Sequence, residues 1–360
     1  MSLLSQEIID RSIGMAFGTA VGDAMGIPFE NLNPEQIVEI QMLSKKDETL
    51  FVNTAGRNPY IPKEWATGRW GDATQLSLAI MHAIAKYLNN TGKPNLSLID
   101  SIVDEHVKEW WECRDGWGNG TRSAIERIAG GMYSYKTSGG SSTGNGVIMK
   151  LTPIAFFFHV CKHDVDNELV EAICQMTHMN SVTITTAFIY IYLCMFIFEY
   201  GLPSSREEKE VFLQHILQLS LKYENTYNLT IPKELLSIRI HRYLENIDDI
   251  NDRILLDVSH GGTYFCVDTL SMVIGLLVTK PVSFATMEKA IGMGGDTNIV
   301  AAMIGALLGA AQGQKTIDPR HCEVVYRTDY VRRIGEEFGQ TLTQYLNLPA
   351  DSNSQVENFN

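Results

Sequence analysis

The chain has 360 residues, of which 45% are hydrophobic and 20% are charged, so it contains enough apolar material for a large buried core. Its 42 acidic and 29 basic side chains give a net charge of −13. This balance disfavours a nucleic-acid or anionic-membrane partner bound through bulk electrostatics, and we expect neither.

Three features favour a cytoplasmic protein. The longest unbroken apolar run, Ala187 to Phe198, is shorter than the roughly 20 residues that a bilayer requires, so it predicts a buried helix or strand. The N-terminus lacks the basic region, short apolar stretch and cleavage site of a secretion signal. The six cysteines are widely scattered and include no CxxC pair, which favours reduced thiols over a disulfide framework.

Helical periodicity dominates the chain from end to end. Apolar residues recur at three- and four-residue spacings over residues 5–25, 74–89, 99–113, 121–133, 167–200, 207–223, 233–246, 267–278, 284–292, 299–312 and 328–346. Leu50 to Asn53 is a weak candidate for extended structure. We therefore predict an all-α fold, a single compact multi-helix orthogonal bundle over residues 1–348, with a polar, disordered tail over residues 349–360.

Small residues recur every four positions near both ends of the chain. The first segment has Gly14, Gly18, Gly22 and Gly26, and the second runs from Ala301 to Gly313. Each helical glycine costs roughly 1 kcal/mol of helix propensity relative to alanine, so a compensating contact is required. The spacing predicts that these two helices pack closely in one core. Taken alone, the glycines favour tight packing without a ligand.

Two irregular regions interrupt the helical pattern. Lys45 to Gly71 is longer than an ordinary connection, which is typical of a functional loop. Ser138 to Gly146 reads Ser-Gly-Gly-Ser-Ser-Thr-Gly-Asn-Gly. Its amides are suited to cradle an anion such as a pyrophosphate, although a plain linker explains the composition equally well.

Residues typical of functional sites fall in a few short segments. Gly294 to Asn298 places a carboxylate, a hydroxyl and an amide on a glycine-rich turn before a helix. The others are Gly22 to Glu30, Gly68 to Gln75, Gly144 to Lys150, and the pair Thr177 and His178. Each segment also has a purely structural explanation. An aspartate at the start of a helix, for instance, is usually an N-cap.

Together, these segments resemble the ADP-ribosylglycohydrolase family in order and spacing, from about Ile8 to Gly313. The family's GDA-L-G-x-x-x-E-like run is matched by Gly22 to Glu30, and its GNG-x-x-M-R segment by Gly144 to Lys150, with Lys150 in place of arginine. The remaining matches are the Thr-His pair at Thr177 and His178, the D-T-L run at Asp268 to Leu270, and the GGDTDT turn at Gly294 to Ile299.

The resemblance implies a cleft with two Mg²⁺ ions, held by a Thr-Asp-Asp triplet and an Asp-x-Asp-Thr turn. Here the triplet becomes Gly71, Asp72 and Ala73, and the turn becomes Asp296, Asn298 and Ile299. The metal ligands that remain are Asp72, Asp296 and Asn298. Two carboxylates do not balance the charge of two divalent ions, so we expect at most one Mg²⁺, and an empty site is equally compatible.

The resemblance also implies a hydrolase that releases ADP-ribose from an amino-acid side chain, with ADP-ribose or an ADP-ribosylated protein as its partner. The catalytic residues would be Glu30, Asp72 and Asp296. The substrate-binding residues would be Asp115, Gly144, Asn145, Gly146, Met149, His178, Gly294 and Gly295. Trp70, Trp117 and Tyr133 are candidates to stack on adenine, although each is more typical of a core aromatic.

Two alternatives remain open at this stage. One is a binding or structural protein, a family member that keeps the fold, with or without the nucleotide cleft, but turns nothing over, as the loss of ligands at Gly71, Ala73 and Ile299 favours. The other is metal-free chemistry on a different ribosyl substrate. The hydrolase hypothesis requires that Asp72 and Asp296, which are far apart in the sequence, meet in one pocket.

Overall fold

The computed structural model describes residues 3–43, 50–52, 57–61, 65–90 and 97–348. Over these ranges the regular structure is helical, apart from two isolated bridges, Gly140 to His178 and Gly144 to Phe265. The all-α prediction is therefore confirmed. The extended structure proposed at Leu50 to Asn53 is wrong for its described part, since Leu50 to Val52 form an irregular bend. Asn53 and the proposed tail over residues 349–360 lie outside the described residues.

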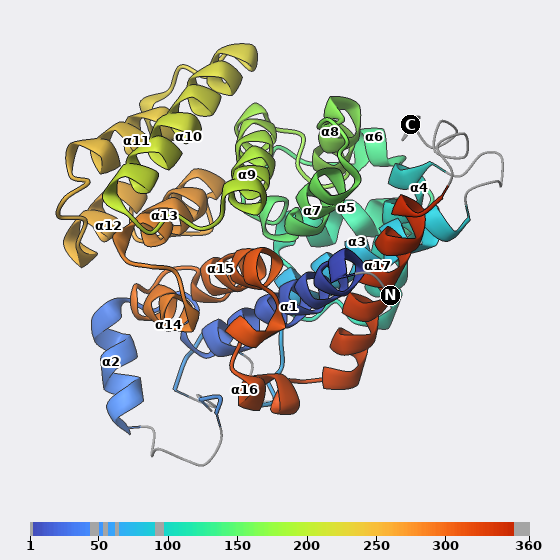
Figure 1. Ribbon diagram of the computed structural model, residues 1–360, viewed down its shortest axis with the longest axis horizontal. Coiled ribbons are helices and arrows are strands. Elements are labelled where there is room, and N and C mark those ends of the chain that lie inside the picture. The colour runs from blue at the N-terminus through green and yellow to red at the C-terminus, as the bar shows by residue number, and fades with distance from the viewer. Residues whose placement is uncertain (1–2, 44–49, 53–56, 62–64, 91–96, 349–360) are drawn as a thin grey trace.

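Figure 1 shows how the helices of the described residues are arranged. In chain order they are α1 (Leu3–Gly26), α2 (Pro34–Leu43), α3 (Asp72–Asn89), α4 (Leu98–Glu112), α5 (Asn119–Ala129), α6 (Tyr135–Ser138), α7 (Thr152–Cys161), α8 (Asn167–Gln175), α9 (Ser181–Tyr200), α10 (Arg206–Thr226), α11 (Leu236–Glu245), α12 (Asp252–Ser259), α13 (Cys266–Thr279), α14 (Phe284–Gly292), α15 (Thr297–Gln312), α16 (Pro319–Val324) and α17 (Thr328–Leu346). Short 3₁₀ turns lie at η1 (Ile27–Phe29), η2 (Ile148–Lys150), η3 (Pro232–Glu234) and η4 (Gln314–Thr316).

Several predicted boundaries change in the structure. The single helix predicted over 167–200 is two helices, α8 and α9, because the chain turns at Met176 to Asn180 and the Asn180 side chain caps α9 by accepting from the backbone N of Val182. Helices α2, α6, α7, α12 and α16 were not predicted. α7 is apolar on every side, so its sequence carries no helical alternation of polar and apolar residues.

Helices α1 and α15 pack with their backbones almost in contact, as the glycine spacing predicts. A Cβ atom added at Gly18 would lie 2.0 Å from the carbonyl oxygen of Gly305, and one at Gly22 would lie 2.3 Å from that of Ala301. Gly14 meets Gly313 and Gly26 meets Asn298, so the two helices run antiparallel. Figure 1 shows α1 and α15 side by side at the centre of the molecule, with α17 also against α1.

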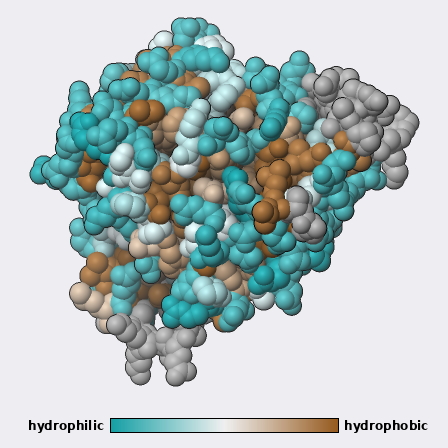
Figure 2. Space-filling view, viewed as in Figure 1, coloured by the Kyte–Doolittle hydropathy of each residue, from teal (hydrophilic) through white to brown (hydrophobic). Residues whose placement is uncertain are grey.

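Helix α9 carries the long apolar run. By length and composition alone, it is the one described helix that could cross a membrane, but 72% of its apolar window is buried inside the protein. It packs against α7, α8, α10 and α13, so it is the kind of core helix that also passes that test. Figure 2 shows hydrophilic residues over most of the face in view, with hydrophobic residues in smaller patches between them.

The antiparallel pair determines where the polar residues of the site lie. The C-terminal end of α1 leads through η1 to Glu30, and the same end of the pair carries Asp296 and the first turn of α15. The N-terminus of α3 lies against α1 there, because the backbone N of Gly71 donates to Asp23 on α1 across 2.9 Å. Three segments that are distant in sequence therefore meet at one place.

Substitution of Gly18 by alanine tests this close contact. We expect Gly18→Ala to destabilise the protein by about 3 kcal/mol, near the upper end for overpacking a core, because the new methyl group meets the backbone of α15 rather than a movable side chain. Gly292→Ala in α14 is the matched control, since an added Cβ there has no neighbour within 4 Å. Urea denaturation measures both free energies of unfolding. Equal, small effects would contradict the packing described here.

Candidate active site

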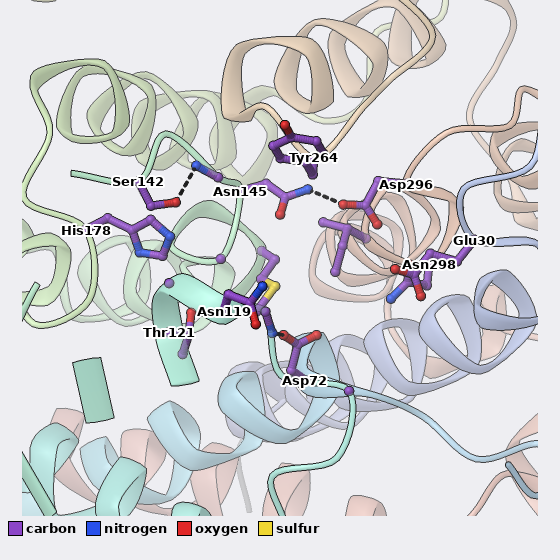
Figure 3. Close-up of a pocket in the computed structure, with 17 residues that line it drawn as sticks. Glu30, Asp72, Asn119, Thr121, Ser142, Asn145, His178, Tyr264, Asp296 and Asn298 are labelled. Atoms are coloured by element: carbon purple, nitrogen blue, oxygen red, sulfur yellow. Dashed lines mark hydrogen bonds between the residues drawn. The ribbon is translucent and has the colours of Figure 1, made fainter. Parts of the chain in front are cut away.

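A polar cavity of about 460 Å³ opens where these segments meet (Figure 3). Its lining combines glycines, short polar side chains and three acids, and contains no lysine or arginine from the described part of the chain. The lining residues are Glu30, Asp72, Gly116, Gly118, Asn119, Gly120, Thr121, Ser142, Gly144, Asn145, Gly146, Met149, His178, Tyr264, Asp296, Asn298 and Ile299.

The three acids reach the cavity from three different segments. Glu30 follows η1, Asp72 is the first residue of α3, and Asp296 immediately precedes α15. Figure 3 shows Glu30 and Asn298 together on one side, with Asp296 above them and Asp72 below. Asp72 and Asp296 are thus not separate caps on opposite surfaces, and the convergence that the hydrolase hypothesis requires is present.

A fourth acid, Asp23, lies behind the cavity and ties these segments together. Its Oδ2 accepts from the backbone N of Gly71 at 2.9 Å and from the backbone N and Oγ1 of Thr74 at 3.0 and 2.7 Å. Its Oδ1 accepts from Asn298 Nδ2 at 3.3 Å. Asp23 is fully buried on α1, so one carboxylate fixes the start of α3 and the first turn of α15 relative to α1.

Burial and mutual repulsion keep these acids partly protonated. Burial, and then the neighbouring Asp23, raise the pKa of Asp72 to about 7. Burial also raises the pKa of Glu30, and Asp296, Asp72 and Asp23 raise it further. The pKa of Asp296 is raised by burial, but the hydrogen bond from Asn145 opposes that shift. The environment therefore favours the protonated form most strongly at Glu30.

The opposite end of the cavity is built around a neutral histidine. His178 is almost fully buried, and burial together with the nearby Lys150 lowers the pKa of its imidazole to about 3. Its Nδ1 lies 2.8 Å from Thr177 Oγ1. Gly120 and Gly146 pack directly against the ring, where a Cβ atom would come within 3.1 and 3.2 Å of it. The cavity is therefore long, with His178 at one end and the acids at the other.

Lys150, which takes the place of the family's arginine, lies beneath the cavity rather than in its lining. It is fully buried, with Nζ 3.1 Å from His106 Nε2. Burial lowers the pKa of the ammonium group to about 8. Lys150 thus places a buried positive charge below the carboxylates without contacting a ligand in the cavity.

The glycine-rich segment does not offer all the amides that an anion nest requires. The backbone N of Gly140 donates to Thr177 O, that of Gly144 to Ser142 Oγ, and that of Asn145 to Tyr264 O. These amides are hydrogen bonded within the protein, so this part of the expected nest is wrong. The segment instead anchors two neighbouring loops and presents Ser142, Gly144, Asn145 and Gly146 to the cavity.

The structure brings together most, but not all, of the expected site residues. Those that line the cavity are Glu30, Asp72, Gly144, Asn145, Gly146, Met149, His178, Asp296 and Asn298. Gly294 and Gly295 do not line it. Both have positive φ angles, 77° and 73°, and a Cβ atom at Gly295 would lie 2.1 Å from Gly261 O, so they shape the turn. Asp115 is mainly exposed and pairs with Arg69 at 3.4 Å in a neighbouring cavity.

The aromatic residues proposed to stack on adenine lie elsewhere. Trp70 is buried and donates from Nε1 to Tyr326 O, Trp117 donates from Nε1 to Gln75 Oε1, and Tyr133 lies near Arg127. The aromatic side chain that lines the cavity is Tyr264, which is 70% exposed at its rim. Its position two residues after Gly261 and Gly262 was the signal in the sequence, because a large aromatic residue beside a glycine turn has few core contacts.

Hydrogen bonds already occupy one oxygen of each aspartate that lines the cavity. Within the described ranges, no group of three or more His, Cys, Asp or Glu side chains is arranged to hold a metal ion. Asp72 Oδ2 accepts from the backbone N of Gly118 at 3.1 Å, and Asp296 Oδ2 accepts from Asn145 Nδ2 at 2.6 Å. One feature suits a single cation: Asn298 Oδ1 is buried and has no hydrogen-bond partner among the described residues.

Removal of the Asp23 carboxylate tests its role in holding the site together. We expect Asp23→Ala to lower the free energy of unfolding by about 3 kcal/mol, because the buried backbone N–H groups of Gly71 and Thr74 lose their acceptor. Ser12→Ala is the control on the same helix, since the buried Ser12 hydroxyl donates only to Ile8 O one turn earlier. Urea denaturation measures the free energy of unfolding of both variants. If Asp23→Ala loses no more stability than Ser12→Ala, Asp23 does not hold these segments together.

The chain is similar to known proteins over most of its length. The sequence matches the ADP-ribosylglycohydrolase family over residues 4–347. It is 21% identical to ADP-ribosylarginine hydrolase Tri1 of Pseudomonas putida (strain GB-1), over 97% of this chain and 83% of that protein. It is also 21% identical to the protein of the same name from Serratia proteamaculans (strain 568), over 92% of this chain and 79% of that one.

A solved structure described as an ADP-ribosylglycohydrolase-related protein complex has a similar fold. It superposes with a TM-score of 0.62 at 22% sequence identity, and the match covers 93% of this chain and 99% of that one. The family match spans nearly the whole chain and includes every residue that lines the cavity. The chain therefore belongs to the ADP-ribosylglycohydrolase family.

Proposed function

We propose that the protein is a hydrolase that cleaves the glycosidic bond between ADP-ribose, or a related ribosyl nucleotide, and an acceptor side chain. The observation that carries this proposal is the meeting of Glu30, Asp72 and Asp296 at one end of a long polar cavity. Family membership and the similarity to two ADP-ribosylarginine hydrolases support the same class of reaction.

The shape of the cavity suggests how the nucleotide would lie. The first turn of α5, at Asn119, Gly120 and Thr121, faces the middle of the cavity, and a helix N-terminus favours phosphate oxygens. Tyr264 stands at the rim, where its exposed ring is suited to stack on a base. With the pyrophosphate near α5, the distal ribose reaches the acids.

The acids are suited to the two proton transfers of hydrolysis. Water attacks the anomeric carbon of the distal ribose, a C–O bond forms, and the bond to the acceptor atom breaks. Asp296, whose charge is favoured by the hydrogen bond from Asn145, would accept the proton of the attacking water. Glu30, whose pKa is raised by burial and then by the surrounding acids, would donate a proton to the departing acceptor atom.

We propose that the site works with at most one Mg²⁺ ion. Asp72, Asp296 and Asn298 would hold it, and its charge would balance the clustered carboxylates. The ligand positions at Gly71, Ala73 and Ile299 offer no side-chain oxygen, and Ala73 is fully buried outside the cavity lining. The proton transfers described above need only the side chains of the protein.

A second candidate function is that of an ADP-ribose-binding protein without turnover. The observation that favours it is that one oxygen of each aspartate is already occupied, Asp72 by the amide of Gly118 and Asp296 by Asn145. Both candidates predict nucleotide binding, and only the first predicts release of ADP-ribose. Incubation of the purified protein with ADP-ribosylated arginine and serine peptides, read by mass spectrometry, separates the two.

Replacement of Glu30 tests the proposed proton donor. We expect Glu30→Gln to lower the rate of ADP-ribose release by roughly 10²- to 10⁴-fold, the usual contribution of general acid-base catalysis, with ADP-ribose binding changed far less. Glu35→Gln on the exposed start of α2 is the control. If Glu30→Gln keeps the wild-type rate, Glu30 takes no part in the chemistry.

Restoring the family's metal ligands in the turn at Asp296 to Ile299 tests the number of metal ions that the site binds. We expect calorimetric titration of the metal-stripped wild type to give at most one Mg²⁺ per chain. The double variant Asn298→Asp with Ile299→Thr should bind Mg²⁺ roughly tenfold more tightly, because affinity rises with the number of charged oxygen ligands. Ser142→Asp adds the same charge at the far end of the cavity and is the control. Two ions in the wild type, or an equal gain from Ser142→Asp, would contradict the proposal.

A further inference from the structure

A second cavity of about 590 Å³ lies on the other side of the acids. It shares part of its wall with the first cavity, and the shared residues are Glu30, Asp72, Gly116, Gly118, Asn119 and Asn298. Any molecule that extends from one cavity into the other therefore passes the carboxylates. If the nucleotide occupies the first cavity as proposed above, the group bonded to its distal ribose points into the second.

The two cavities differ in chemistry. The first is lined by glycines and short polar side chains, whereas the second adds the aromatic rings of Tyr60, Trp65 and Trp117 and the guanidinium groups of Arg69 and Arg122. Such a wall suits the side chains of a peptide better than a phosphate or a sugar.

The charged groups of the second cavity are not equivalent. The Arg69 guanidinium lies 4.4 Å from the centre of the Trp65 ring and 3.4 Å from Asp115 Oδ2, so Arg69 and Asp115 neutralise each other. Arg122, by contrast, is exposed, and its side chain has no hydrogen bond or ion pair with any other part of the described chain. Apart from Glu30 and Asp72 on the shared wall, the one unpaired charge among the described lining residues is therefore the positive charge of Arg122.

Helix α5 explains why Arg122 faces this side. Asn119 lines both cavities, Gly120 and Thr121 line only the first, and Arg122 lines only the second. Residues three apart lie on one face of a helix, so Arg122 follows Asn119 along the side that turns away from the nucleotide. The first turn of α5 therefore separates the two cavities.

We propose that the second cavity binds the acceptor segment of an ADP-ribosylated protein, and that Arg122 pairs with an acidic residue next to the modified side chain. This inference rests on the proposed function and adds a preference in the substrate. With a net charge of −13, most of the protein surface repels acidic partners, so an unpaired arginine beside the acids is a local point of attraction.

Binding of two matched peptides tests the preference. Both carry ADP-ribose on the same side chain through a linkage that cannot be hydrolysed, and they differ only in having aspartates or lysines on either side of it. At low salt, we expect calorimetry to show the aspartate peptide binding wild type about two- to fivefold more tightly, as for an exposed ion pair. Arg122→Glu should reverse the order, and 0.5 M salt should remove the difference.

Controls separate this inference from the function on which it rests. Arg253→Glu changes an exposed arginine on α12 that lines neither cavity, and the wild-type preference should persist in it. If wild type binds free ADP-ribose and binds the two peptides with the same affinity, the acidic preference is wrong and the proposed function stands. If wild type binds neither free ADP-ribose nor either peptide, both fail. A preference that survives Arg122→Glu assigns recognition to another residue and overturns this proposal.

Discussion

The close contact between α1 and α15 is the constraint on which the rest of the structure depends. Backbones approach this closely only where at least one of the two facing residues is glycine, so the sequence has little freedom at Gly18, Gly22 and Gly305. The contact brings the end of α1 beside the start of α15. Glu30 and Asp296, which are far apart in the chain, therefore reach the same cavity from positions beside the ends of helical elements.

The clustering of acidic side chains is a second feature that shapes the site. Four acids lie together with no lysine or arginine in the described lining of the cavity, and the fully buried Lys150 lies outside that lining. Unlike the other three acids, Asp23 does not line the cavity. Its oxygens accept hydrogen bonds from the starts of α3 and α15, so its role is to position these helices. The acids that face the cavity retain raised pKa values, which is the condition for groups that exchange protons with a bound substrate.

Much of this was predictable from local sequence, and the remainder depended on tertiary contacts. The four-residue glycine spacing predicted the central helix pair because its cause is local. The acids of the site were predicted through the family resemblance. Neither pattern indicates that Asp23 accepts from Gly71, that the amides of the glycine-rich segment are already bonded, or that Tyr264 reaches the rim, because each depends on a partner distant in sequence. The break between α8 and α9 was missed because apolar spacing continues through it.

The acids lie between the two cavities. The first cavity is polar, and the second contains aromatic rings and two arginines. A crystal structure with ADP-ribose tests the central claim most directly. We expect the distal ribose to lie beside Glu30, Asp72 and Asp296, with the pyrophosphate near the first turn of α5. A nucleotide bound elsewhere on the protein, or one whose distal ribose points away from these three acids, would contradict the account.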